Sequence, residues 1–197
     1  MEKNYKLSIA WYVNSCVPLN KAIEATKAPL IMLSNPECFH VGDVVAAAIE
    51  NTNDKNYIVF ACYALSEQQT RQFFDSGEVS YMDPYSSSVG GNKGWYNHSV
   101  INPRPYHFAS CITRKNMDKV GGFDEDYAYG ISWDDDDFLQ STIEVVGEEG
   151  VTIIDEPFVF HQWHYKPGSF NHQNMANPSL EKRNKKIYHE KHPKQNI

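Results

Sequence analysis

The chain has 197 residues and a formal net charge of -7, with 25 acidic residues against 18 lysines and arginines. This length and a 41% share of hydrophobic residues favour one folded domain with an apolar core and exclude wholesale disorder. The acidic balance argues against nucleic-acid binding as the main activity, because such proteins neutralise phosphates with lysines and arginines.

The sequence has no pattern typical of a membrane span or a secretory leader. Its longest apolar runs, such as residues 44–49, are far shorter than the roughly 18 residues of a spanning helix. Residues 1–6 lack the apolar stretch of a leader, so we expect a cytoplasmic protein. The cysteines have neither zinc-ligand spacing nor disulfide density, which predicts reduced and mostly buried thiols at Cys16, Cys38, Cys62 and Cys111.

The first half of the chain predicts alternating strands and helices. Apolar residues alternate over 7–13, which predicts a strand, and a short helix is expected over 19–27. Short, continuous apolar runs predict buried strands over 30–33 and 57–63. The helix between these two strands is expected to bury Val44, Val45, Ala47, Ala48 and Ile49. Such alternation predicts an α/β domain with right-handed crossovers.

The second half continues the same alternation. Helices are expected over 66–75, 115–120, 134–146 and 179–190, and strands over 108–113, 151–154 and 158–161. Two long segments, 76–104 and 166–178, lack periodicity and predict loops, which at this length are usually functional.

Four consecutive aspartates, Asp134 to Asp137, follow Trp133 at the start of a predicted helix. One interpretation is an acidic helix terminus on a solvated face, where the helix dipole offsets part of the repulsion. The other is that one carboxylate is a general base or holds an acceptor hydroxyl. The residues alone leave both interpretations open.

Two further groups follow predicted buried strands. His161 and His164 are spaced to suit a divalent metal if a carboxylate comes from elsewhere, although histidines at strand ends are often only hydrogen-bonded. Asn35, Glu37 and His40 lie at the tip of another strand, where oxygen ligands could meet a metal-bound diphosphate. The alternative there is an ordinary proline turn.

Taken together, these motifs resemble those of inverting GT-A-fold glycosyltransferases, most like family 2. Residues 120–125 followed by 133–138 are similar to the family's "GGFDE … (W)EDxDL" pattern, and the chain also has similarity to the C-terminal region of β-1,4-galactosyltransferases. Asn35-Pro36-Glu37 stands where the family has Asp-x-Asp, which keeps two oxygen-bearing side chains but only one charge. The resemblance covers roughly residues 20–165.

The resemblance implies a GT-A-like α/β fold, a mixed sheet flanked by helices, in one glycosyltransferase-like domain over residues 1–197. In that fold residues 19–165 form the core, and residues 166–197 supply a lid loop and a C-terminal helix. Residues 1–18 correspond to a remnant of the nucleotide-binding half, most of which is expected to be missing. Apolar surface left by that loss would favour a homo-oligomer or a partner chain.

The implied function is transfer of a sugar from a nucleotide-diphosphate donor, commonly a UDP-sugar, to a glycan or other hydroxyl acceptor with inversion. A divalent metal, Mn²⁺ or Mg²⁺, is the implied cofactor. The implied residues are Asn35 and Glu37 for the donor, Glu37, His161 and His164 for the metal, Asp135 and Asp134 for catalysis, and Trp133, Gly121 and Gly122 for the acceptor.

Three other interpretations stay open. The chain could be a non-catalytic remnant that binds a carbohydrate or a nucleotide, or a subunit whose missing half comes from a partner chain. It could also be a metal-dependent hydrolase that uses Glu37, His161 and His164, which leaves the pattern over 121–137 unexplained. None of these interpretations requires a membrane span or a nucleic-acid partner.

Overall fold

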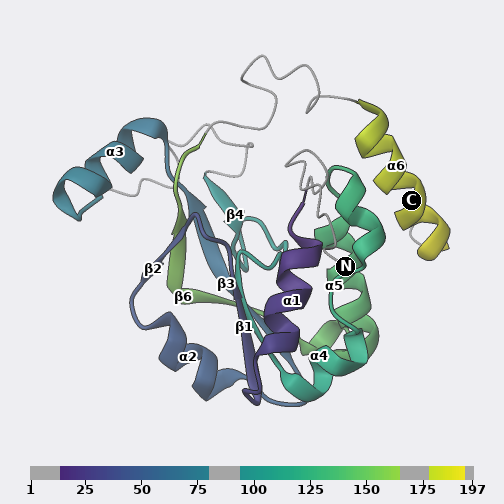
Figure 1. The fold of residues 1–197 in the computed structure, drawn as a ribbon. Helices are drawn as coiled ribbons and strands as arrows, with labels where there is room; N and C mark the ends of the chain where they lie inside the picture. The colour runs from purple at the N-terminus through teal and green to yellow at the C-terminus, as the bar shows by residue number, and fades with distance from the viewer. Residues whose placement is uncertain (1–13, 80–93, 165–177, 194–197) are drawn as a thin grey trace, which may run out of the picture. The chain divides into compact units, whose positions relative to one another are not determined.

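The computed structural model of the chain describes residues 14–79, 94–164 and 178–193 (Figure 1). The strand expected over 7–13 and nearly all of the loop expected over 166–178 lie outside these residues. Among the described residues, no helix is both long enough and apolar enough to cross a membrane.

The chain forms two compact units. The sheet unit comprises residues 28–120 and 139–165, and the helical unit comprises residues 1–27, 121–138 and 166–197. One helix, α5, contributes residues to both units.

The sheet unit is built on a six-stranded mixed sheet. Its strands are β1 (Leu30–Ser34), β2 (Cys38–Val41), β3 (Tyr57–Ala64), β4 (Trp95–Asn97), β5 (Ala109–Thr113) and β6 (Val151–His161). They lie in the order β1-β5-β3-β6-β2, with β4 paired to β3. Strands β3 and β6 are parallel, whereas β1 with β5, β3 with β5, β3 with β4 and β2 with β6 are antiparallel. An α/β fold with a mixed sheet is therefore confirmed.

The helices are α1 (Cys16–Ala25), α2 (Val44–Asn51), α3 (Glu67–Ser76), α4 (Arg114–Val120), α5 (Asp134–Val146) and α6 (Pro178–Lys191), with short 3₁₀ turns η2 (Glu125–Tyr129) and η3 (Glu148–Gly150). Helices α2, α3 and α4 belong to the sheet unit, α1 and α6 belong to the helical unit, and α5 is shared. Local sequence sets the start of α3, because Ser66 and Gln69 form a reciprocal capping box. Gly77, in the left-handed conformation, ends the same helix.

Strand β3 is the centre of the core, since all of its residues are buried. On one face of the sheet, Ile58 and Phe60 belong to an apolar cluster with Val44 and Ala48 of α2. On the other face, Tyr63 packs among aromatic side chains that include Trp95 and Phe160. Removing these apolar surfaces from water is the main stabilisation of the sheet unit.

The structure corrects the expected inner face of α2. Val44 and Ala48 are buried as predicted, but Val45 is 47% exposed and Ile49 is 63% exposed. A short surface helix buries only one stripe of side chains spaced four residues apart, so the neighbouring stripe faces solvent. The prediction that Val45 and Ile49 face inward was therefore wrong.

Several element boundaries also differ from the expectations. Helix α1 begins at Cys16 instead of residue 19, and the two strands expected over 151–154 and 158–161 form one continuous strand, β6. Strands β2 and β4 were not predicted, because each is only three or four residues long and neither is a continuous apolar run. The cysteines carry free thiols as expected, and all are buried except the half-buried Cys38.

Candidate functional site

Antiparallel pairing of β2 with β6 brings Glu37 beside the end of β6. In this ladder Cys38 lies opposite His161. The Gln162 N–H then donates to the Glu37 carbonyl oxygen at 3.0 Å, which extends the pairing by one step. His164 follows close after β6. Sheet register therefore places residues from two distant segments at one edge of the sheet unit.

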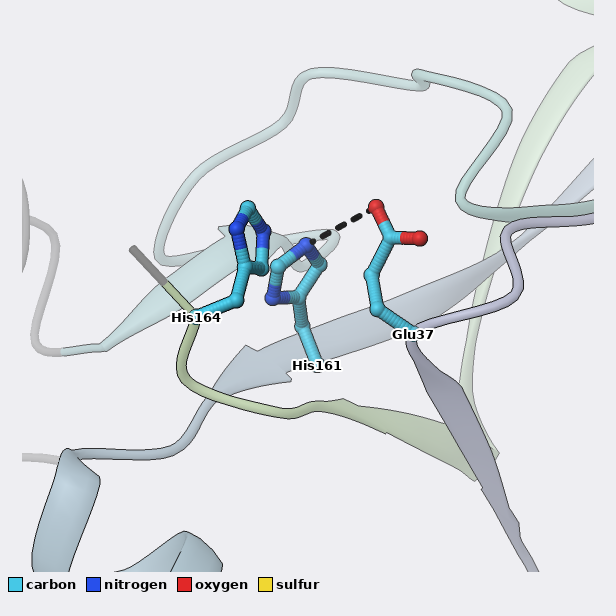
Figure 2. Close-up of side chains that lie close together, drawn as sticks. All are labelled: Glu37, His161 and His164. Atoms are coloured by element: carbon cyan, nitrogen blue, oxygen red, sulfur yellow. Dashed lines mark ion pairs between the residues drawn. The ribbon is translucent and has the colours of Figure 1, made fainter. Parts of the chain in front are cut away.

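The side chains of Glu37, His161 and His164 form one group (Figure 2). Each offers one ligand atom, and these atoms lie within 4.8 Å of one another. The Nε2 atom of His161 is 3.4 Å from Oε1 of Glu37, and the two imidazole rings are 5.3 Å apart between centroids. Metal–ligand bonds to nitrogen and oxygen are about 2.0–2.2 Å, so two ligand atoms of one ion lie at most about 4.4 Å apart. The 3.4 Å pair fits within this limit, and the group as a whole lies close to it. The structure thus brings together all three residues predicted as metal ligands.

The surroundings of His161 select the nitrogen that can bind a metal. Its Nδ1 atom is 2.8 Å from the carbonyl oxygen of Gln162, and since a carbonyl only accepts, Nδ1 carries the proton. The lone pair of neutral His161 then lies on Nε2, the atom that faces Glu37. Tyr96 and Phe108 hold the ring edge-on, at centroid distances of 5.2 and 5.6 Å. A hydrogen bond from the second ring nitrogen to a carbonyl oxygen is the usual support of a metal-binding histidine.

The carboxylate of Glu37 is prepared as an anionic ligand. When His161 carries a proton on both nitrogens, its Nε2–H donates to Glu37. This hydrogen bond is the main cause that lowers the pKa of Glu37, and the positive charges of protonated His161 and His164 act in the same direction. The Asn35 amide lies 3.4 Å from Oε1 of Glu37, so the two residues predicted to bind the donor share one turn. Glu37 is 25% exposed and His164 is exposed, which leaves the group accessible from solvent.

The acidic turn, residues 133–137, belongs to the helical unit and is not a uniformly solvated cap. Asp134 is only 8% exposed, whereas Asp135 and Asp136 are half-buried. Burial, followed by the charge of Asp135, raises the pKa of Asp134 to about 7. Asp134 is therefore partly protonated at neutral pH, and its environment differs from that of Asp135.

Asp137 has a structural role. It is 3% exposed and accepts hydrogen bonds from the Tyr127 hydroxyl at 3.3 Å and from Lys191 at 2.9 Å. The Nε2 atom of His192 lies 2.8 Å from the same carboxylate. Lys191 also reaches Asp124 at 3.1 Å. These bonds fasten the C-terminal end of α6 to the start of α5.

Trp133 is held in an uncommon backbone conformation. Ser132 and Trp133 have φ values of 60° and 72°, in the left-handed region that residues other than glycine rarely adopt. The buried amide of Asn184 stabilises this turn by donating to the Ser132 and Tyr127 carbonyl oxygens at 2.9 and 3.0 Å. The half-buried Trp133 ring, predicted to bind the acceptor, lies beside Tyr188 of α6 at a centroid distance of 5.2 Å.

Gly121 and Gly122, which the resemblance implies for the acceptor, form a tight turn. Their φ values are 85° and 80°. The Asn20 amide clamps the next residue, since it accepts from the Phe123 N–H and donates to the Phe123 carbonyl, both at 2.8 Å. A Cβ at position 122 would lie 2.6 Å from Oδ1 of Asn20, so this clamp requires glycine there. Acceptor binding by the two glycines stays a prediction.

Sequence reasoning did not identify the residues that support these groups. Gln162 acts through its main chain, which leaves no signature in the sequence. Asn184, Lys191 and His192 support the acidic turn from α6 and the residue after it, and nothing in their spacing indicates that pairing.

No protein-family model matches this sequence, and no curated protein sequence matches it. The resemblance to glycosyltransferases therefore depends on the short sequence motifs alone. The geometry of the described residues is a separate observation.

Proposed function

We propose that the chain is a metal-dependent glycosyltransferase that moves a sugar from a nucleotide-diphosphate donor to an acceptor hydroxyl with inversion. The convergence of Glu37, His161 and His164 is the observation that supports this proposal most. The family resemblance implied these ligands from separate segments, and the pairing of β2 with β6 provides a physical reason for them to meet.

The three side chains Glu37, His161 and His164 fit a divalent ion that accepts nitrogen ligands. Two imidazoles and one carboxylate favour Mn²⁺ over Mg²⁺, which prefers oxygen ligands and retained water. An ion held there would stabilise the negative charge that develops on the leaving diphosphate. The Asn35 amide, in the same turn as Glu37, is positioned to donate a hydrogen bond to a phosphate oxygen.

Asp134 and Asp135 have different roles at the acceptor: Asp134 positions it, and Asp135 is the base. Burial keeps part of the Asp134 population protonated at neutral pH, so it adds less repulsion and can donate a hydrogen bond to the acceptor. Asp135 takes the proton of the acceptor hydroxyl as that oxygen bonds to the anomeric carbon and the bond to the diphosphate breaks. Attack from the face opposite the leaving group inverts the anomeric configuration.

Calorimetric titration with uridine diphosphate, with and without Mn²⁺, tests the donor site. We expect Mn²⁺-dependent binding that falls at least about tenfold in Glu37→Gln, because the substitution removes one charged ligand. The matched control is Glu50→Gln on the exposed side of α2, which should bind like the parent. Binding that ignores Mn²⁺, or that is equal in both variants, contradicts the proposal.

A metal-dependent hydrolase is the second candidate. The observation in its favour is the group of ligands itself, since two histidines and one carboxylate also hold catalytic zinc. This candidate leaves the turn at Gly121 and Gly122 and the acidic turn without a role. Zinc-dependent ester hydrolysis without binding of uridine diphosphate would favour it.

A further inference from the structure

Helix α6 carries an exposed cationic strip, defined as Lys182, Lys185, Lys186 and His189. The spacing of three and four residues places these side chains on one face of the helix. The three lysines are exposed and His189 is half-buried. The opposite face, with Asn184 and Tyr188, is buried in the helical unit.

The charges of the strip are largely uncompensated within the described part of the chain. Lys186 lies 3.7 Å from Glu190, an exposed pair of the kind that contributes little. Among the described residues, Lys182 and Lys185 have no acidic partner within ion-pair distance. In a chain with a net charge of -7, such a strip is a local exception that favours an anionic ligand.

An aromatic ring adjoins the strip. The ammonium of Lys185 lies 5.6 Å from the centroid of the Trp133 ring, and the His189 ring is 5.5 Å from it. An aromatic face packs well against the apolar C–H face of a sugar, and flanking ammonium groups pair with carboxylates. We propose that the strip and Trp133 bind a carboxylate-bearing glycan, which names the acceptor class and rests on the proposed function.

Two other anionic partners fit less well. A helix that lies on a membrane needs an exposed apolar face, but Leu180, Ile187 and Tyr188 of α6 are half-buried or buried. A nucleic acid presents a dense and continuous line of phosphates, which a chain with a net charge of -7 repels as a whole. An oligosaccharide with spaced charges matches a strip whose ends are roughly 10 Å apart along the helix axis.

The test is calorimetric titration of the full chain with oligogalacturonate and with a neutral malto-oligosaccharide of equal length. We expect binding of the acidic oligosaccharide alone, with an affinity that falls as salt rises. Lys182→Glu/Lys185→Glu/Lys186→Glu should weaken it at least about tenfold. The matched control, Lys27→Glu/Lys55→Glu/Lys119→Glu, makes the same charge change at exposed positions and should stay within about twofold.

Several results would overturn the inference: no binding, equal binding of the neutral oligosaccharide, equal losses in the two triple variants, or tighter binding of single-stranded DNA or anionic vesicles. Thermal melting of each variant confirms that it is folded. Mn²⁺-dependent binding of uridine diphosphate, measured on the same samples, separates the two proposals. Loss of uridine diphosphate binding with oligogalacturonate binding intact would contradict the proposed function. Uridine diphosphate binding without oligogalacturonate binding would contradict only the role of the cationic strip.

Discussion

The Nδ1 atom of His161 determines which side of that ring can bind a metal. Its hydrogen bond to the Gln162 carbonyl oxygen, at 2.8 Å, leaves Nε2 facing Glu37. The spacing of the two histidines indicated a ligand pair from the sequence. The tautomer could not be predicted, because it depends on a main-chain oxygen whose position follows from how β6 ends.

Asp134 should make the stability of the chain depend on pH. Its pKa is about 7 in the folded state and about 3.9 in an unfolded chain, so the folded state holds more protons between these values. The free energy of unfolding should therefore fall as the pH rises from about 4 to about 7, by at most about 4 kcal/mol. Asp134→Asn, which is neutral throughout, should flatten this slope in urea denaturation measured across the pH range.

The control for that prediction is Asp118→Asn. Asp118 has a 64% exposed side chain and lies 3.8 Å from Arg114, so its loss should leave the slope unchanged. An Asp134→Asn slope equal to that of the parent would mean that the Asp134 carboxyl is hydrated in solution.

At the scale of elements, the two faces of α2 give a direct test of its packing. Val44→Ala removes buried methyl groups and leaves a cavity, which should lower the free energy of unfolding by about 2 kcal/mol. Val45→Ala makes the same change at a side chain that is 47% exposed, so the effect should stay within about 0.5 kcal/mol. Urea denaturation of both variants measures the difference, and equal losses would place Val45 in the core.

The elements that the sequence predicted well are those with strong local signals. Strand β3 is a continuous apolar run, and α3 begins with a capping box, so local chemistry specifies each of them. Strand β2 has no such signal, because its residues are half-buried or exposed and it depends on pairing with β6. That non-local pairing is also what brings Glu37 to the histidines.

At the scale of the whole molecule, the candidate residues were predictable but their support was not. Glu37, His161 and His164 were predicted as ligands, and the described structure brings them together. The acidic turn was predicted as a helix start, but the different environments of its aspartates were not predicted. Asp137, for example, is held by Lys191 and His192, which follow more than 50 residues later in the chain. Contacts between distant segments leave no period or motif in a single sequence.

Mn²⁺ titration followed by electron paramagnetic resonance measures whether Glu37, His161 and His164 hold one divalent ion. We expect one ion per chain, with affinity lowered at least about tenfold in His164→Ala, an exposed position where folding should not suffer. His40→Ala, at an exposed histidine of β2, is the matched control and should bind like the parent. Equal binding by both variants, or no binding by the parent, would mean that these three residues do not form a metal site.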